Sequence, residues 1–578
     1  MTHYFIFDIE TTGTPVFSDF RVMSYSWGLD TQVHTVHTLG EAVNALRAAL
    51  TMDTVIVGHN ILCFDLPVLL YHHQRTGAKA PLKAELIKAG REGRLWDTLV
   101  FSTKLFPDRE RHGMASWKEV MALKYGVEGK VEIDDFATAS DEAIGRRCAH
   151  DVRIQQCLTK YFCEELGAPD TVANWDVDCA FVPVVLDLLT TGVPYDRAEA
   201  DKARKRVEAR LAVPGAVWES TAVGVNPNSN KQIHEWLKSK GHEGLDLTEK
   251  GNPQFNKKNR LAMVNRYPEL SPLLRLATER GTAQFLDKGS AKNCENFLRE
   301  SPVTKTESLF PSLNVFGTRT HRAAYSSPPL NQFPKHIRSI VKVPEGWLMV
   351  GCDIVALEMS VIGRCFEEVL GDSAVADQVR SGVSVKQLTL DAFAPAMEDT
   401  VYQPGQTPES LAKTLNYALL YGAGKDLLSQ MLNADLSVVE ECIDRRFPGF
   451  RRLSEAVSDG VKGGQEDGVL STFYGTRVRT ARWKALNTLC QASGAEYSKR
   501  VFIYLHDKIK HMFAEAHAVI HNHDEMEWII RTADRPFVEA QMKSIQDGLE
   551  GHMHGLDDGV GFLTGIDWHI GRSWAEVH

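Results

Sequence analysis

The sequence predicts a multidomain chain that joins an α/β domain to α+β units. Its 578 residues are too many for one hydrophobic core, because domains usually hold about 100–200 residues. Short apolar runs alternate with helical patterns over residues 1–165, which is typical of an α/β domain. Closely spaced acids follow apolar runs at residues 8–10 and again at residues 524–525, near the two ends of the chain.

Composition excludes several classes of protein. The net charge of −10 excludes a wholly basic surface but leaves room for a local basic channel. The ten cysteines form no CxxC pair, which favours free thiols over a disulfide frame or a zinc site. The start, MTHYFIFDIE, is unlike a signal peptide, and no apolar run reaches the roughly 18 residues of a membrane span. We therefore expect a cytoplasmic location and no membrane partner.

The elements follow in order along the chain. Apolar runs predict strands in HYFIFDIE and in TVIVGHN, residues 54–60, and helical spacing marks residues 41–50. Residues 166–310 are mostly helical and rich in Lys and Arg, and the Pro/Ser-rich residues 311–335 predict irregular structure. A strand over residues 347–353 ends on an acid, residues 354–515 are dominated by helices, and residues 518–528 predict a hairpin.

The first set of acids suits a divalent cation. Asp8 and Glu10 are two residues apart on a strand, so both side chains lie on one face. Asp65 follows the second strand, and Asp151 begins an apolar helix. Convergent carboxylates repel one another unless a cation such as Mg²⁺ neutralises them. The alternative is that Asp8 and Glu10 only cap a turn.

A second set of acids has the same character. Asp353 leaves the strand of residues 347–353, and Asp524 with Glu525 forms the tip of the late hairpin. If these strands are neighbours, the carboxylates meet at one edge, where two Mg²⁺ ions would cancel their repulsion and serve phosphoryl transfer. The alternative is an exposed acidic turn.

A helix between the two acidic segments carries a cation and two aromatic rings. Lys413, Tyr417 and Tyr421 are four residues apart, so they share one helical face. This combination suits a triphosphate beside a stacked base. The alternative is a surface Lys beside core tyrosines.

The N-terminal motifs resemble a known nuclease family. DIETTG, then HNILCFD, then an Asp before an apolar helix resemble the DEDD 3′–5′ exonucleases. The resemblance implies an RNase H-like domain that holds two metals. Its catalytic residues would be Asp8, Glu10, Asp65 and Asp151, and its metal ligands would be Asp8, Glu10 and Asp151. The family usually has Tyr or His where this chain has Arg147 or Arg146, and Arg stays protonated. We therefore expect attenuated proofreading, or His150 as a substitute.

The remaining motifs resemble family A DNA polymerases, of the polymerase I-like, short phage type. They are DIVALE, AKTLNYALLYG and HDE, with THRAAYSSPPLNQFP, ALNTLCQASGAEYSK and the ending IDWHIGRSWAEVH. The resemblance implies a right-hand polymerase after the exonuclease domain. The implied boundaries are exonuclease 1–165, thumb and start of palm 166–315, first part of palm 316–366, fingers 367–482, and second part of palm with the catalytic hairpin 483–578.

The resemblance also implies residue roles. Asp353 and Asp524 would bind two Mg²⁺ ions, Glu525 would support them, and Lys413 would contact the triphosphate. Glu358, Tyr417 and Tyr421 would bind the nucleotide, with Glu358 excluding a 2′-hydroxyl. The residues expected to reach the primer-template are Arg322, Gln332, Asn487, Gln491 and His523.

One departure concerns the triphosphate. The family commonly has Arg one turn before the Lys, where this chain has Glu409. Glu409 could pair with Lys413, four residues on, for roughly 0.2–0.5 kcal/mol. We expect Lys425 or Arg482 to supply the lost contact, or nucleotide affinity to be reduced.

The expected function is addition of deoxynucleotides to a primer in phage genome replication. The expected partners are primer-template DNA and dNTPs, with a replisome helicase or single-strand binding protein, and the chain is expected to be a monomer. Neither the thumb insertion that recruits thioredoxin nor an N-terminal 5′-nuclease domain is expected. The alternatives are a gap-filling repair polymerase, an exonuclease with a degenerate polymerase half, a DNA-binding scaffold, and a single-subunit RNA polymerase.

Overall fold

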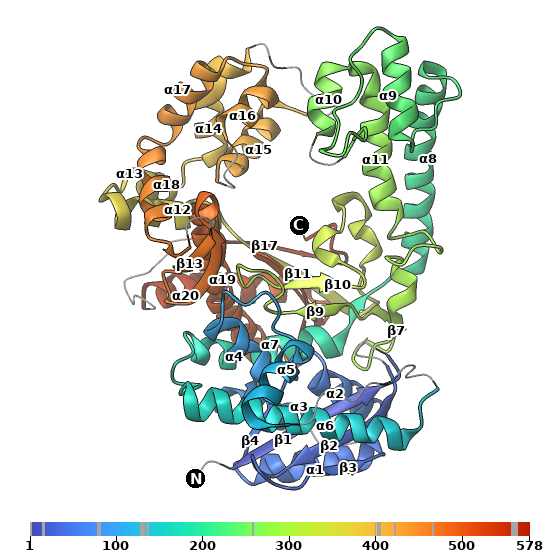
Figure 1. Ribbon diagram of the computed structural model, residues 1–578, viewed down its shortest axis with the longest axis vertical. Helices are drawn as coiled ribbons and strands as arrows, with labels where there is room; N and C mark the ends of the chain where they lie inside the picture. The colour runs from blue at the N-terminus through green and yellow to red at the C-terminus, as the bar shows by residue number, and fades with distance from the viewer. Residues whose placement is uncertain are drawn as a thin grey trace.

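The structure is a computed structural model of the whole chain. It describes residues 3–577 apart from 14–17, 78–81, 128–132, 134–137, 257–258, 399, 401–405, 421–423, 465–466 and 556–564. Figure 1 shows an N-terminal domain at the base, a central sheet above it, and two helical lobes that rise on either side of an opening. The chain ends near the base of that opening.

The N-terminal domain is built on a five-stranded sheet in the order β3-β2-β1-β4-β5. β1 is antiparallel to β2 and parallel to β4, so the strand that carries Asp8 and Glu10 is central. Its strands are β1 (Tyr4–Thr11), β2 (Phe20–Ser26), β3 (His34–Val36), β4 (Val55–Gly58) and β5 (Leu95–Asp97). Sequence analysis predicted β1 and β4 but missed β2, β3 and β5.

Six helices surround this sheet. They are α1 (Leu39–Thr51), α2 (Asp65–Arg75), α3 (Leu82–Arg91), α4 (Thr98–Leu105), α5 (Met114–Tyr125) and α6 (Asp141–Lys160). α1 begins where the Thr38 hydroxyl accepts a hydrogen bond from the backbone N–H of Glu41, which confirms the helix expected at residues 41–50. α6 packs on β1 and β2, and this contact brings Asp151 to the acids of β1.

The central sheet has four antiparallel strands in the order β15-β16-β11-β17. They are β11 (Trp347–Ile354), β15 (Ala516–Asn522), β16 (Glu525–Arg531) and β17 (Ile566–Gly571). The predicted strand at residues 347–353 and the predicted hairpin are therefore neighbours. Asp353 lies directly opposite Glu525 on one side and Asp567 on the other.

One lobe rises after β11. Its helices are α12 (Leu357–Leu370), α13 (Ala374–Arg380), α14 (Val385–Phe393), α15 (Pro408–Leu420), α16 (Lys425–Leu432), α17 (Leu436–Arg446) and α18 (Phe450–Asp459). A small sheet follows, of β12 (Lys462–Gly463), β13 (Asp467–Ser471) and β14 (Arg477–Ala481). The sequence pattern had predicted that helices dominate residues 354–515, as they do, but it gave no sign of this small sheet.

The other lobe is formed by α8 (Arg197–Thr221), α9 (Asn230–Ser239), α10 (Arg260–Arg266) and α11 (Ser271–Ala283). Short strands join it to the centre: β6 (Val193–Pro194), β7 (Leu298–Glu300), β8 (Glu307–Leu309), β9 (Ser312–Asn314) and β10 (Ala324–Ser326). The pairing of β9 with β10 corrects the expectation that residues 311–335 are irregular.

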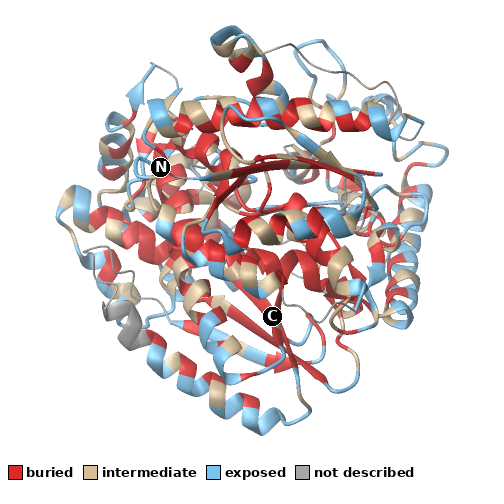
Figure 2. Ribbon diagram, turned by 90° about the horizontal axis from the view of Figure 1, so that it is seen from below, coloured by how far each residue is buried: buried red, intermediate tan, exposed pale blue. Residues whose placement is uncertain are grey.

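The core lies along α7 (Trp175–Thr191) and α19 (Ala485–Met512), with α20 (Arg535–Gly555) alongside. Figure 2 shows that buried residues fill the central sheets and helices, whereas exposed residues lie on the outer helices. Among the helices that the structure describes, none is both long and apolar enough to cross a membrane.

Candidate active site

A cavity of about 800 Å³ opens where the central sheet meets α15. It contains the acids of the two strands together with the cation and ring of α15. Its lining includes Arg322, Lys335, Asp353, Glu358, Lys413, Tyr417, His523, Asp524, Glu525 and Asp567. Residues that are far apart in the sequence, such as Asp353 and Asp524 at 171 positions, therefore meet in one cavity.

Strand pairing brings the two acidic segments together. β11 and β16 are antiparallel neighbours in which Asp353 faces Glu525, and the Ile354 N–H donates to the Asp524 carbonyl at 3.0 Å. Asp524 lies in the turn after His523, whose φ of 65° is in the left-handed region. The turn thus directs the Asp524 side chain into the same cavity as Asp353.

The carboxyl groups hold protons unusually firmly. Burial, followed by the charge of Asp524, raises the pKa of Asp353 to about 7. Burial and Glu358 raise the pKa of Asp524 to about 6. This excess of negative potential in a cavity of oxygen donors fits divalent cations such as Mg²⁺, which would remove the repulsion.

Glu525 is held from behind by two residues that sequence analysis missed. Arg338 donates to Glu525 Oε1 at 3.0 Å, and Trp574 Nε1 donates to the same oxygen at 2.7 Å. The Arg338 guanidinium lies 4.0 Å from the Trp574 ring centre. All three side chains are buried, so this carboxylate is fixed in position. Trp574 belongs to the C-terminal motif already noted, whereas nothing in the sequence singled out Arg338.

The nucleotide-binding residues expected from the motifs gather at the same cavity. Lys413 Nζ lies 6.0 Å from the ring centre of Tyr417, one turn further along α15. Arg322, expected to contact DNA, pairs at 3.3 Å with Glu358, the acid expected to exclude a 2′-hydroxyl. Tyr421 lies outside the residues that the structure describes.

Neither of the two cations expected to supply the lost triphosphate contact is among the residues that line the main cavity. Lys425 pairs with Glu440 at 2.5 Å in a different cavity, and Arg482 donates to the Ser458 and Val461 carbonyls. The cations that do line the main cavity beside Lys413 are Arg322 and Lys335. Burial and its neighbours Arg338 and Lys413 lower the pKa of Lys335. Its position after Pro334 gave no sequence signal.

Glu409 also differs from expectation. Its expected pairing with Lys413 is not among the ion pairs of the described residues. A hydrogen bond with Thr407, together with the backbone, lowers the pKa of the exposed Glu409 carboxyl. The Glu409 side chain therefore bonds to the residue that precedes α15, and the Thr407 hydroxyl also accepts from the Ser410 N–H at 3.2 Å.

The other expected DNA contacts are more scattered. Gln332 is exposed, Gln491 is half-buried on α19, and Asn487 donates to the Leu420 carbonyl at 3.2 Å. Burial lowers the pKa of His523, so a neutral imidazole lines the cavity. Of the five, only Arg322 and His523 line the main cavity.

The acids of the N-terminal domain form a second cluster. Oxygen atoms of Asp8, Glu10 and Asp151 all lie within 4.8 Å of one another. Asp65 is buried beside them and accepts a hydrogen bond from the Ile9 N–H at 3.0 Å. The four residues expected to converge are therefore neighbours, although Asp65 is not part of the three-oxygen cluster.

Burial and mutual repulsion dominate the electrostatics of this cluster. Burial raises the pKa of Asp8 well above its ordinary value, and Asp65 and Asp151 add to the shift. Burial likewise raises the pKa of Glu10, and that of Asp65 to about 8. Burial alone would raise the pKa of Asp151, but His150 and Lys118 outweigh it and the pKa is lowered.

Cations of the protein contact two of these acids. Lys118 Nζ lies 2.5 Å from Asp151 Oδ1, and Arg147 Nε lies 3.1 Å from Glu10 Oε1. His150 Nδ1 is 3.6 Å from Asp151 Oδ1, so it touches the cluster only at the edge. Sequence analysis identified Arg147 and missed Lys118, which lies on α5.

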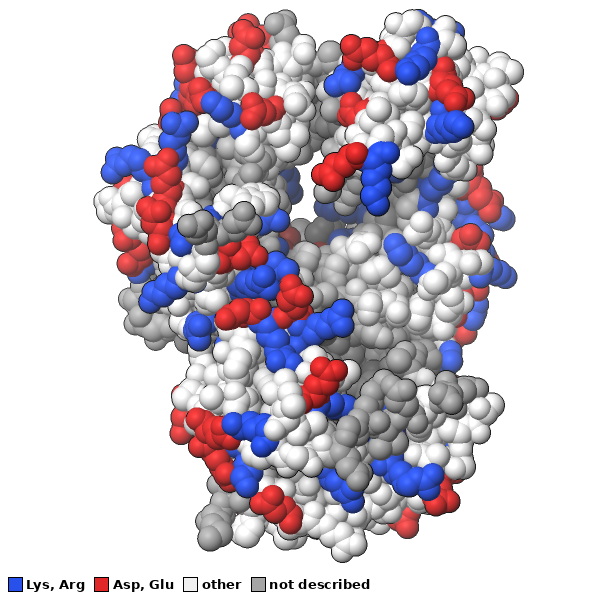
Figure 3. Space-filling model, in the orientation of Figure 1, with Lys and Arg blue, Asp and Glu red and all other residues white. Residues whose placement is uncertain are grey.

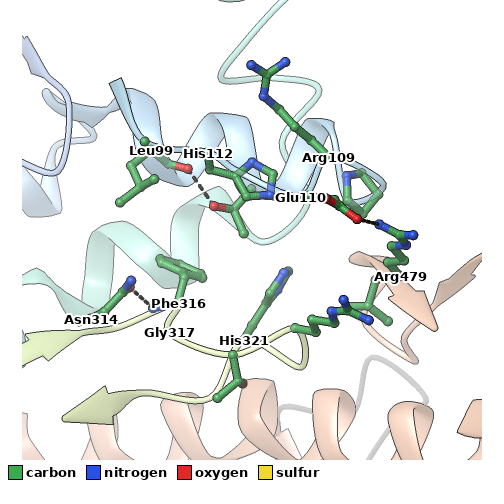
Figure 4. Close-up of a pocket in the computed structure, with 15 residues that line it drawn as sticks. Leu99, Arg109, Glu110, His112, Asn314, Phe316, Gly317, His321 and Arg479 are labelled. Atoms are coloured by element: carbon green, nitrogen blue, oxygen red, sulfur yellow. Dashed lines mark hydrogen bonds and ion pairs between the residues drawn. The ribbon is translucent and has the colours of Figure 1, made fainter. Parts of the chain in front are cut away.

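A smaller cavity of about 390 Å³ lies between α4, the loop after it, and residues 314–321. Figure 4 shows His321 pointing into this cavity and Arg479 meeting Glu110 at its edge. The loop after α4 thus contacts the central part of the chain here, and no acid of either cluster lines the cavity.

Comparison with known proteins places these sites in context. Residues 197–576 match the family model described as DNA polymerase family A. DNA polymerase I of Pseudomonas aeruginosa is 22% identical over 524 residues, which is 84% of this chain and 54% of that protein. A DNA polymerase of Mycobacterium phage L5 is 24% identical over 446 residues, which is 71% of this chain and 67% of that protein.

Coverage of the relatives is partial. DNA polymerase I of Chloroflexus aurantiacus is matched over 47% of its length, so the chain spans about half the length of such relatives. The chain also matches a solved structure, the POL domain of Pol1 from M. smegmatis in complex with DNA primer-template and dNTP. The matched region covers 100% of this chain and 96% of the chain in that structure. The TM-score is 0.72 at 15% identity, which shows a shared fold.

Proposed function

Because the chain belongs to DNA polymerase family A, we propose that it is a template-directed DNA polymerase that adds deoxynucleotides to a primer 3′ end. The observation that carries the proposal is the meeting of Asp353, Asp524 and Lys413 in one cavity. A degenerate polymerase half would not require these three groups together, and the same arrangement argues against a DNA-binding scaffold.

The residues of the cavity divide the work. Asp353 and Asp524 are the carboxylates that would hold Mg²⁺, with Glu525 fixed behind them by Arg338 and Trp574. Bound Mg²⁺ would supply charge stabilisation to the attacking 3′-oxygen and to the phosphoryl oxygens. Lys413 lies across the cavity, where its ammonium would contact the triphosphate and donate a proton to the departing pyrophosphate.

The base and sugar of the nucleotide would lie against α15. Tyr417 offers an aromatic face one turn from Lys413, which suits a nucleoside next to its phosphates. Glu358 is 8% exposed and pairs with Arg322, so its bulk is held in place where a 2′-hydroxyl would need room. This pairing supports selection of deoxynucleotides over ribonucleotides.

Lys335 is our candidate for the phosphate contact that Glu409 cannot make. It lines the cavity with Lys413 and stands near enough to Asp353 and Glu525 to feel their charges. A second ammonium at this position would bind the polyphosphate from the palm side. We expect Glu409→Arg to lower the nucleotide KM, and an unchanged or higher KM would refute a merely suboptimal site.

The N-terminal domain is proposed to be a 3′–5′ exonuclease module with attenuated proofreading. The support is the clustering of Asp8, Glu10 and Asp151 next to Asp65. The proposed attenuation rests on Arg147. This residue occupies the position where the family usually has Tyr, and its guanidinium stays protonated and cannot act as a base. Genome replication in a phage, and association with a helicase or single-strand binding protein, remain predictions.

One gel tests the proposal. A labelled primer-template with a matched or mismatched 3′ end is incubated with Mg²⁺, with and without dNTPs. We expect the wild type to extend the matched primer, Asp353→Ala to abolish extension, and Asp8→Ala to leave it intact. Extension that survives Asp353→Ala would refute the assigned site, and preferred incorporation of ribonucleotides would favour an RNA polymerase.

A further inference from the structure

Two of the three acids in the N-terminal cluster already have a counter-charge from the protein. Lys118 comes from α5 and lies 2.5 Å from Asp151, and the two side chains are 6% and 10% exposed. Because neither group reaches much water, each depends on the other for compensation of its charge. This is a buried ion pair inside a set of oxygens that would otherwise suit a metal.

Arg147 compensates the second acid. It precedes Asp151 by one turn of α6, so it faces the same side of the helix and reaches Glu10 at 3.1 Å. Its guanidinium is always charged. The two ion pairs therefore compensate Asp151 and Glu10, two of the three acids of the cluster.

The third acid is held by neutral donors. Gln155 Nε2 donates to Asp8 Oδ1 at 3.0 Å, and the Cys148 thiol lies 3.6 Å from the other oxygen. A divalent ion entering this cluster would have to displace Lys118 from Asp151 and would meet two protein cations at close range. The donor types suit a metal, but the arrangement of these residues does not fit one.

We propose that Lys118 is a built-in counter-ion that, with Arg147, takes the charge positions of a divalent metal and leaves the nuclease site latent. The inference rests on the proposed function only in treating the cluster as an exonuclease-type site. It accounts for a domain that keeps the acids of a nuclease while two of its three clustered acids are paired with cations of the protein.

Metal binding tests this directly. The full-length Asp353→Asn/Asp524→Asn protein lacks the polymerase metal ligands, so Mn²⁺ binding followed by electron paramagnetic resonance reports the remaining cluster. We expect no site in the millimolar range in this parent and at least about tenfold tighter binding after Lys118→Met. Lys124→Met is the matched control, because Lys124 lies on the same helix and pairs with Glu165 away from the cluster.

Thermal stability gives an independent readout. Without metal, Lys118→Met leaves Asp151 uncompensated, so its melting temperature should fall below that of the parent and rise again with added Mn²⁺. The Lys124→Met melting temperature should not respond to Mn²⁺. If the Met variant does not fold, Lys118→Gln, which keeps a hydrogen-bond donor without the charge, takes its place.

Several outcomes overturn the proposal. One is a parent protein that already binds Mn²⁺ as tightly as the Lys118→Met variant, with loss of that site in Asp151→Asn. Another is a wild type that degrades a single-stranded 3′ end and loses this activity on Lys118→Met, since Lys118 would then serve the reaction. Primer extension by the protein with Asp353 and Asp524 intact tests the polymerase separately, so neither result decides the other.

Discussion

At the scale of single residues, His321 shows a local conflict between backbone and side chain. Its φ is 56°, in the region where a side chain costs about 1–2 kcal/mol. The imidazole is nevertheless 5% exposed and packs edge-to-face on Phe316, with ring centres 5.6 Å apart. The packing of the ring therefore offsets a strained backbone.

A pair of variants separates the two effects. His321→Ala and His321→Gly both remove the ring, but only Gly relieves the positive φ. We expect the Gly variant to exceed the Ala variant in free energy of unfolding by about 1 kcal/mol, measured in urea. Equal stability of the two would contradict the strain.

Lys335 allows a kinetic prediction. If it contacts the triphosphate, Lys335→Ala should raise the dNTP KM by about tenfold or more in primer extension, the scale of one charge-assisted hydrogen bond. Lys342→Ala is the control, since Lys342 pairs with Asp196 at 3.1 Å and lies outside the cavity. A KM unchanged by the first variant would remove Lys335 from the nucleotide site.

The raised pKa values of Asp353 and Asp524 predict coupling between metal and protons. Carboxyl groups with pKa values of about 7 and about 6 keep protons near neutral pH, and binding of Mg²⁺ must release them. Affinity for Mg²⁺ should therefore rise with pH up to about 8 and then level off.

Calorimetry in two buffers of different ionisation enthalpy measures this release. We expect the wild type to release more protons than Asp353→Asn near neutral pH, and the difference to vanish once both acids are ionised. A release that is the same in both proteins at every pH would contradict the assignment of the shift to this site.

At the scale of elements, α7 holds two buried aspartates that link parts of the chain. Asp178 pairs with Lys104 of α4 and with Lys499 of α19. Asp187 pairs with Lys83 of α3 at 2.6 Å and with Lys510 of α19 at 3.4 Å. Each aspartate thus joins the N-terminal domain to the helix that supports the central sheet.

Asp187 yields a stability prediction with a defined pH dependence. Asp187→Ala leaves half-buried Lys83 without this partner and removes a buried carboxylate, so the free energy of unfolding should fall by about 3–5 kcal/mol. Burial alone would raise the pKa of Asp187, but Lys83 and His517 outweigh it and hold it well below the ordinary value. The stabilisation is therefore present above the ordinary Asp pKa and lost as pH falls through the folded pKa.

Urea unfolding of both proteins across acid and neutral pH checks this. Their difference should be constant near neutrality and shrink below about pH 4. The Lys83→Met/Asp187→Leu double variant should recover much of the loss, whereas Lys88→Ala, at an exposed pair with Glu92, should change stability by less than about 1 kcal/mol. A difference independent of pH would point to lost packing instead.

Elements with strong local signals were predictable from sequence. The runs before Asp8 and Asp353, the helix with Lys413 and the late hairpin all appear as predicted, because apolar periodicity fixes them locally. β2 was missed because its polar residues, such as Ser24, are buried by neighbouring strands. Lys118 and Lys335 were missed because their roles arise only from tertiary contacts, and periodicity carries no information about these.

At the scale of the whole molecule, association with DNA must overcome a net charge of −10. Figure 3 shows Lys and Arg side chains on both lobes beside the opening, interspersed with acids. Binding through phosphates should weaken with salt, with a log–log slope of about −0.9 per contact. Fluorescence anisotropy over a salt series measures the slope, and a flat response would exclude a primer-template channel.

The paired aspartates of α7 bear on the role of the N-terminal domain in the whole chain. The N-terminal domain supplies Lys83 and Lys104 to the buried aspartates of α7, and α7 in turn packs on β15 of the central sheet. The domain therefore has a structural role that does not depend on nuclease activity. Deleting the residues before α7 would remove those partners and expose the helix to solvent. We therefore expect the N-terminal domain to be needed for the stability of the central sheet.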